Sequence, residues 1–313
     1  MLAKMTLLIG LLNGSVKPDT TLPTKPLMKR DTVLADTSKT KIRSEPKEPE
    51  AYMIQQVTYV SEFVKRFNNQ ITADGKPVPD SLRSRSPAVR KQVINQLFDR
   101  LGSAAISRTS FLRTHREQFL EQVCDDHHPI DLTFLSEKLY ASVQLQAAYQ
   151  GKEQPIIFYL KSAAAKQSYV WKIVDVQAPF LTGKSSTKSQ TQTPNDSLFI
   201  PLNAQETAFL NLFNHIRDRH SLLGLAANPE NPSPSLVMLS DMVSQGQITP
   251  IHTDYPVVYL PMDKGWVIQL NFSNRKDENS GWLITDLYQV QGTDIKRLPT
   301  PFIPYISQNH TRK

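Results

Sequence analysis

The sequence predicts an α+β protein of two tandem modules, each with its helix or helices packed on a curved antiparallel sheet. Two observations carry this prediction. Apolar residues recur at helical spacing up to about residue 123, and at the alternating spacing of strands from Leu139 onward. The same order of helix and strands returns after a polar linker at residues 182–200. The 39% hydrophobic fraction of the 313 residues is sufficient for a sizeable core.

Three helices are expected before the first strand. The first begins near Glu50, and one apolar face is formed by Met53, Val57, Val60, Val64 and Phe67. The second begins at Ser86-Pro87, where an N-cap residue precedes a proline at the first helical position, and Gly102 ends it. The third covers residues 110–123.

From Leu139 the pattern is typical of strands. The first strand has one apolar face, formed by Leu139, Ala141, Val143, Leu145, Ala147 and Tyr149. Further strands are expected at residues 156–160 and 169–177. The last of these runs into Gly183-Lys184-Ser185, but Ala178 stands where a phosphate-binding loop needs its first glycine, and no helical period follows. This segment is therefore not predicted to bind a nucleotide.

The second half repeats the order of helix and strands. Asn203 and Glu206 can cap a helix whose apolar positions are Phe209, Leu212, Phe213 and Ile216. Strands are expected at residues 248–260, 266–272 and 282–290.

Short matches link the two halves. Trp171-Lys-Ile-Val-Asp175-Val matches Trp282-Leu-Ile-Thr-Asp286-Leu at an offset of 111 residues. Phe63-Val-Lys-Arg-Phe67-Asn68 matches Phe209-Leu-Asn-Leu-Phe213-Asn214 at an offset of 146 residues, which indicates a helical insertion in the first copy between Asn69 and about Ile130. The predicted organisation is a first module at residues 51–181, a linker at 182–200 and a second module at 201–292.

An amphipathic helix followed by an antiparallel meander, whose last strand begins with Trp and carries alternating apolar residues, resembles the nuclear transport factor 2-like, or cystatin-like, α+β cone. The resemblance covers residues 51–181 and again 201–292. It implies a cone-like sheet in each module. Ketosteroid isomerase-like members of this family use an Asp as a general base, so the resemblance also brings an enzymatic alternative.

The ends of the chain differ in composition from its middle. Residues 1–15 resemble a signal peptide, with Lys4 before a short apolar run, and residues 16–50 are typical of a flexible leader. Residues 293–313 are expected to form a basic tail. The net charge of +7 resides in these ends, because residues 51–295 hold 23 basic and 23 acidic side chains. We therefore expect a periplasmic or secreted protein, with a cytoplasmic one as the alternative, and no membrane span or specific nucleic-acid partner.

The densest group of metal-binding residue types is Cys124-Asp125-Asp126-His127-His128, in which Cys124, Asp126 and His128 are the candidate ligands. Five consecutive residues can rarely all point at one ion. Because the run follows a predicted helix, a solvated helix end with a buried Cys is the favoured interpretation. No cofactor is expected, and no Gly-x-Ser-x-Gly motif of a nucleophilic hydrolase is present.

Asp175 and Asp286 are the candidate catalytic residues. In a regular strand Asp175 shares a face with Trp171, and Asp286 with Trp282. If that face lines the interior of a cone, desolvation would raise the pKa of each carboxyl and produce a general base. The favoured alternative is an Asp that accepts hydrogen bonds at the rim of the sheet.

The preferred function is that of a noncatalytic exported protein whose two modules bind a partner protein, a glycan or a small ligand. Trp171, Trp282 and Tyr259 are the candidate ligand contacts. The alternatives are an isomerase or dehydratase that uses Asp175 or Asp286 as base on a small substrate, and a structural spacer. A pocket in which a carboxylate and a second polar group converge would favour the enzyme, whereas interiors filled by side chains would favour binding or spacing.

Overall fold

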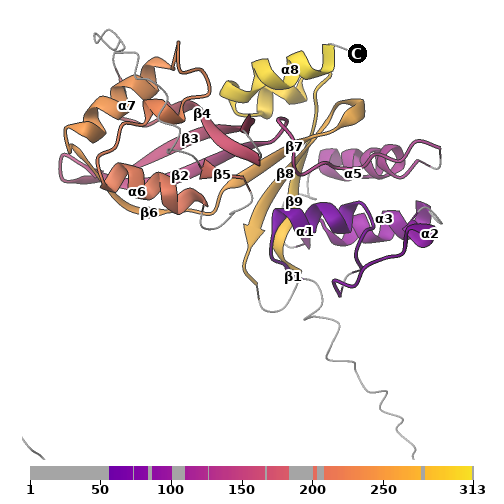
Figure 1. Cartoon of the computed structure of the whole chain (residues 1–313). Coiled ribbons are helices and arrows are strands. Elements are labelled where there is room, and N and C mark those ends of the chain that lie inside the picture. Colours follow the sequence, from indigo (N-terminus) through magenta and orange to yellow (C-terminus); the bar gives the residue numbers. More distant parts are fainter. Residues whose placement is uncertain are drawn as a thin grey trace, which may run out of the picture. The chain divides into compact units, whose positions relative to one another are not determined.

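Strands from both halves of the sequence join in one nine-stranded sheet. A computed structural model describes residues 56–72, 74–83, 87–100, 110–125, 127–165, 168–182, 200–202, 208–275 and 279–311. Across the sheet the order is β1 (Gln56–Val57), β9 (Ser280–Gln289), β8 (Trp266–Ser273), β7 (Val257–Pro261), β2 (Tyr140–Tyr149), β3 (Lys152–Ala165), β4 (Ser168–Gln177) and β5 (Ile200–Pro201). All pairs are antiparallel except β1 with β9, which confirms an α+β fold on a curved antiparallel sheet (Figure 1).

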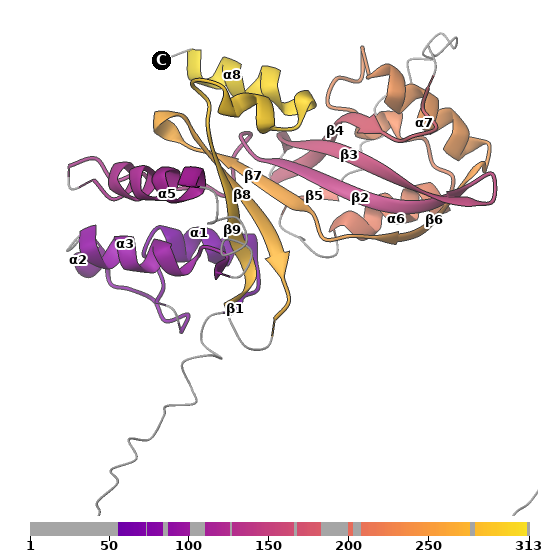
Figure 2. The same cartoon turned by 180° about the vertical axis from the view of Figure 1, so that it is seen from behind.

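The centre of the sheet is the pairing of β2 with two strands of the second half. Residues 140–142 of β2 pair with β7, and residues 145–149 pair with β6 (Ile248–Thr253). The sequence predicts one strand over residues 248–260, but residues 254–256, which include Pro256, interrupt it. Pro256 has no N–H to donate at this point, and pairing with β2 passes from β6 to β7 across the interruption. As a result β6 and the ends of β8 and β9 diverge, as Figure 2 shows from behind.

Seven α-helices are described in these residues. They are α1 (Val60–Phe67), α2 (Asp80–Arg83), α3 (Pro87–Gln96), α5 (Ser110–Val123), α6 (Ala208–Arg217), α7 (Pro234–Ser244) and α8 (Ile303–Thr311). Short 3-10 helices lie at η3 (Leu223–Leu225), η4 (Asp263–Gly265), η5 (Asp294–Arg297) and η6 (Thr300–Phe302). Figure 1 shows α1, α3 and α5 beside β8 and β9, and α6 and α7 beside β2 to β6.

The helices of each half contact the last strand of the other half. α1 and α5 contact β9, while α7 contacts β4. Backbone hydrogen bonds also link the two halves. Asp99 N donates to Ile284 O at 2.9 Å, and Ala227 N donates to Ile173 O at 2.7 Å. The ranges 51–181 and 201–292 therefore do not mark two separate sheets.

Aromatic packing holds the exchanged helices in place. The ring of Phe119 in α5 meets the indole of Trp266 in β8 edge-on, with centroids 5.4 Å apart. The Nε1 of that indole donates to Gln122 Oε1 at 2.8 Å. On the other side, Trp171 of β4 lies 6.2 Å from Phe209 of α6. Both pairs join residues from different halves, so each half completes the core of the other.

Several boundaries differ from the sequence-based expectations. Val57 lies in β1, and the first helix starts at Val60, because residues 56–57 pair with Ser280 and Gly281. α7 was not expected, although Ser233 caps it and Pro234 opens it. The expected signal peptide, leader, linker centre at 183–199 and Asn203 cap lie outside the described residues. In the described part of the chain, every helix is too short or too polar to cross a bilayer.

Replacing Gly281 with Ala should displace β1 from β9. Gly281 has a φ of +89°, and a Cβ placed on it would lie 2.0 Å from the carbonyl oxygen of Val57. Gly292 is the matched control, because its φ is +100° but nothing lies within 4 Å of an added Cβ. In urea unfolding we expect Gly292→Ala to cost about 1–2 kcal/mol from backbone strain alone, and Gly281→Ala at least about 2 kcal/mol more from the clash. Equal losses would contradict the close contact between β1 and β9.

Candidate functional site

A bulge in each of two strands decides where the predicted site residues point. In β4, Ile173 pairs with Leu160 and Asp175 with Tyr159, so Val174 is an extra residue. A bulge puts two residues of one strand opposite one of its partner, which reverses the alternation of faces beyond it.

The same bulge occurs in β9. Ile284 pairs with Leu270 and Asp286 with Gln269, so Thr285 is the extra residue. The prediction that each Asp shares a face with its Trp is therefore wrong. Trp171 and Trp282 lie in the main core, while Asp175 and Asp286 lie on the opposite face of the sheet.

The two tryptophans are parts of the core. Trp171 is 4% exposed and Trp282 is fully buried. Trp282 meets Phe272 edge-on, with ring centroids 5.7 Å apart. The Nε1 atoms of both indoles are buried with no hydrogen-bond partner among the described residues. These side chains fill the interior, and a ligand could reach them only by displacing the core.

Each of the two aspartates accepts a hydrogen bond from the backbone of its own bulge. Asp175 Oδ1 accepts from Val176 N, and Asp286 Oδ1 accepts from Leu287 N, each at 2.8 Å. Asp286 Oδ2 also accepts from Arg297, which follows the last strand. Accepting a backbone N–H and an ion pair is the behaviour expected of a structural carboxylate.

Four tyrosines gather on the face that carries the aspartates. This tyrosine face consists of Tyr140, Tyr159, Tyr259 and Tyr288, which come from β2, β3, β7 and β9. Side chains from residues 295–306 cover it, and Phe302 is fully buried with its ring 5.2–5.5 Å from those of Tyr140, Tyr159 and Tyr259. The expected basic tail thus contains ordered elements.

The tyrosine face is polar beneath its cover. Burial raises the pKa of Tyr259 to about 12, outweighing the opposing effect of a hydrogen bond with Ser142. Burial and the neighbouring Asp286 also raise the pKa of Tyr288, whose hydroxyl donates to Gln269. These phenols therefore stay neutral at physiological pH. Tyr259 is only 6% exposed, so the predicted ligand contact lies under the C-terminal segment.

The described residues of the Cys124–His128 run follow α5 and are linked through Asp125. Asp125 Oδ1 accepts from the backbone N–H groups of His127 and His128, each at 2.9 Å, and these bonds lower the pKa of Asp125. Cys124 is buried, which raises the pKa of its thiol. Asp126 lies outside the described residues. Within the residues that are described, no three His, Cys, Asp or Glu side chains come together as a metal site.

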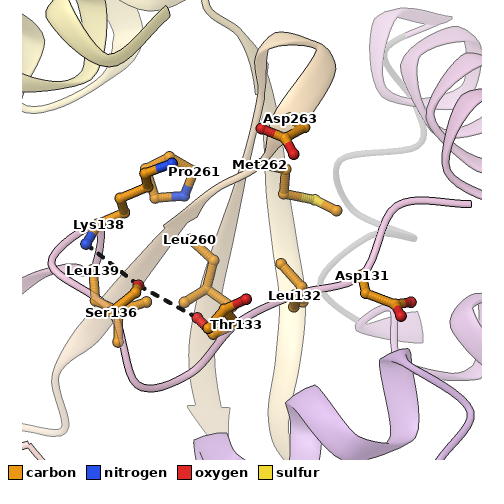
Figure 3. A pocket seen from close by; sticks show the side chains of 10 residues that line it. All are labelled: Asp131, Leu132, Thr133, Ser136, Lys138, Leu139, Leu260, Pro261, Met262 and Asp263. Carbon is orange, nitrogen blue, oxygen red and sulfur yellow. Dashed lines mark hydrogen bonds between the residues drawn. The ribbon is translucent and has the colours of Figure 1, made fainter.

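A cavity of about 180 Å³ lies where residues 131–139 pass over the end of β7 (Figure 3). Its apolar lining consists of Leu132, Leu139, Leu260, Pro261 and Met262. Asp131 also lines it, but its carboxylate pairs with Arg90 at 2.9 Å. Neither Asp175 nor Asp286 is among the lining residues. The cavity therefore does not bring either predicted base to a substrate.

An exposed apolar ledge lies where the sheet divides. It consists of Tyr255 between β6 and β7 and Phe272 in β8. Tyr255 stacks on Phe272 with centroids 4.4 Å apart, although Tyr255 is 54% exposed. A ring that is held by another ring and yet open to solvent is suited to bind an apolar side chain. In the sequence this surface is marked only by Tyr255-Pro256 within an expected strand, a pattern that by itself does not indicate binding.

Comparison with known proteins gives one significant similarity. The chain is 24% identical to the Foldase protein PrsA of Lactococcus lactis subsp. lactis (strain IL1403) over 187 residues, which cover 58% of this chain and 56% of that protein. The chain thus spans about half the length of the curated relative it matches. No protein-family model and no solved structure match the chain.

Asp286→Asn is expected to lower the free energy of unfolding modestly, by about 0.5–1.5 kcal/mol, because a hydrogen bond is weakened. In a double-mutant cycle with Arg297→Gln we expect a coupling of about 0.5–1 kcal/mol, since the two side chains are 18% and 40% exposed. Asp175→Asn is the matched change at the equivalent bulge. Urea unfolding of the four proteins measures the coupling, and a value near zero would contradict the ion pair.

Proposed function

We propose that this chain is a noncatalytic exported protein that binds partner proteins, and that its partners are non-native polypeptides with exposed apolar side chains. The ledge of Tyr255 and Phe272 carries this proposal. Tyr255 is stacked on Phe272 and open to solvent two residues after β6, and the outer side of β6 pairs with no described strand. An apolar side chain of a partner could pack on the rings while the partner's backbone remains extended.

The comparison with known proteins supports the same class. The relative is named a foldase, a name that refers to protein folding, and this supports non-native polypeptides as the partners. The apolar run at the N-terminus, which resembles a signal peptide, supports export to the periplasm or the cell exterior. A glycan or a small ligand remains an alternative partner.

The isomerase-like alternative has weaker support. A general base must reach the proton that it removes. Both candidate aspartates instead accept hydrogen bonds from their own strands, and neither lines the 180 Å³ cavity. Arg297 meets Asp286 as an ion-pair partner, and the two do not line the 180 Å³ cavity.

We also propose that the chain arose from two units of the nuclear transport factor 2-like kind. Three features support this. On the two sides of the β7–β2 pairing, β8 corresponds to β3 and β9 to β4. Both β4 and β9 carry a bulge, and in each the aspartate accepts a hydrogen bond from the N–H of the next residue. Duplication followed by exchange of helices would produce this arrangement.

Tyr255→Ala tests the binding proposal. The probe is lysozyme that has been reduced and carboxamidomethylated, so that it stays unfolded without added negative charge. We expect its affinity for this protein, measured by fluorescence anisotropy, to fall about tenfold when the stacked ring is lost, since an aromatic contact contributes about 1–1.5 kcal/mol.

Tyr59→Ala is the matched control, because Tyr59 is 53% exposed and lies at the start of α1, outside the ledge. It should leave the affinity unchanged. Equal affinity of wild type and Tyr255→Ala, with folding intact, would contradict the ledge as the binding surface. Turnover of a small carbonyl substrate that disappears in Asp286→Asn would contradict the noncatalytic function.

A further inference from the structure

A second cavity, of about 360 Å³, lies between α8 and the start of the β2–β3 hairpin. We call it the α8 groove. Its walls are formed by Tyr140, Lys161, Tyr305 and Gln308. Ala163 and Ala164 also line it, and their small side chains leave the space unfilled. Its volume falls at the lower end of the range of about 300–1,000 Å³ that is typical of ligand pockets.

Two lysines from different elements line the α8 groove. Lys161 belongs to β3, and its Nζ lies 4.7 Å from the ring centroid of Tyr305 in α8. Lys138 lies in the segment before β2. Among the described residues neither ammonium has a carboxylate within 4.0 Å, in contrast to Arg66, Arg90 and Arg275, which are ion-paired. Glu137 is the single acidic lining residue, so the groove keeps a net positive charge.

The floor of the α8 groove is rigid. Ser162 is 1% exposed, and its hydroxyl donates to Ser136 O at 2.7 Å while accepting from Leu139 N at 2.9 Å. These bonds fix the segment that carries Lys138 against the strand that carries Lys161. The two ammonium groups are thus attached to fixed backbone on either side of one cavity, which lowers the entropic cost of binding.

We propose that the α8 groove binds an acidic segment of a polypeptide, with a Glu or Asp carboxylate between Lys138 and Lys161 and the adjoining chain against the ring of Tyr305, which is only partly buried. An ammonium favours a carboxylate through a charge-assisted hydrogen bond. The ring of Tyr305 favours a peptide over a bare anion, because it gains from apolar contact. The inference rests on the proposed protein-binding function and names the chemistry of a second contact, separate from the ledge.

The test uses the full chain and two fluorescein-labelled peptides of alternating Glu and Gly, or Gln and Gly. We expect the Glu peptide to bind at low salt and the Gln peptide to bind at least tenfold more weakly. Lys161→Gln and Lys138→Gln should each weaken binding of the Glu peptide about tenfold, the effect of one lost charge-assisted bond. Lys152→Gln is the matched control, because Lys152 is exposed at the opposite end of β3 and should leave affinity unchanged.

Three results would overturn the proposal. These are equal binding of the two peptides, unchanged affinity in both groove variants with an unchanged unfolding midpoint, and displacement of the Glu peptide by inorganic phosphate at equal charge concentration. Binding of unfolded lysozyme is the measurement that distinguishes failure of this proposal from failure of the proposed protein-binding function. Lys161→Gln should bind that probe normally, and Tyr255→Ala should bind the Glu peptide normally, so that each surface can fail alone.

Discussion

The antiparallel pairing of β2 with β6 and β7 is the constraint on which the rest of the structure depends. It joins residues that are 99 to 119 positions apart in the sequence into one sheet, and α1, α5, α6 and α7 contact that sheet. Because α5 covers Trp266 and α6 covers Trp171, each half buries the other's aromatic residues. Neither half could remove its own apolar surface from water by itself, so burial of the core requires both.

The two bulges give the sheet faces of different character. One face holds the core with Trp171 and Trp282, and the other holds tyrosines, aspartates and their hydrogen bonds. The C-terminal segment covers the second face through Phe302 and leaves a groove at its edge, where Lys161 stands over Tyr305. The two proposed contacts therefore lie at different places on the sheet. The ledge lies where the chain passes from β6 to β7, and the α8 groove lies beside α8, next to the start of β2.

Local sequence patterns predicted most helices and strands, but they did not predict which strands pair across the two halves. The alternation from Leu139 to Tyr149 corresponds closely to β2, and the expected helix at 110–123 coincides with α5. The sequence does not reveal the two bulges, because Trp-x-Ile-x-Asp has the regular period of two that is typical of a strand. The extra residue in each is recognised only from the pairing of β4 with β3 and of β9 with β8. The C-terminal cover was missed although Leu298, Phe302 and Ile306 recur every four residues, because Pro301 and Pro304 disfavour a helix. The ledge and the groove depend on three-dimensional pairing and carry no local motif.

The central claim is that the two halves hold each other's helices, and a cut in the linker between them tests it most directly. A specific protease site would be placed within residues 187–194, and the cleaved protein would be compared with the uncut one by gel filtration in native buffer and in urea. The exchanged arrangement predicts two fragments that elute together at the size of the uncut protein and separate only when they unfold. Two folded fragments that separate in native buffer would contradict it.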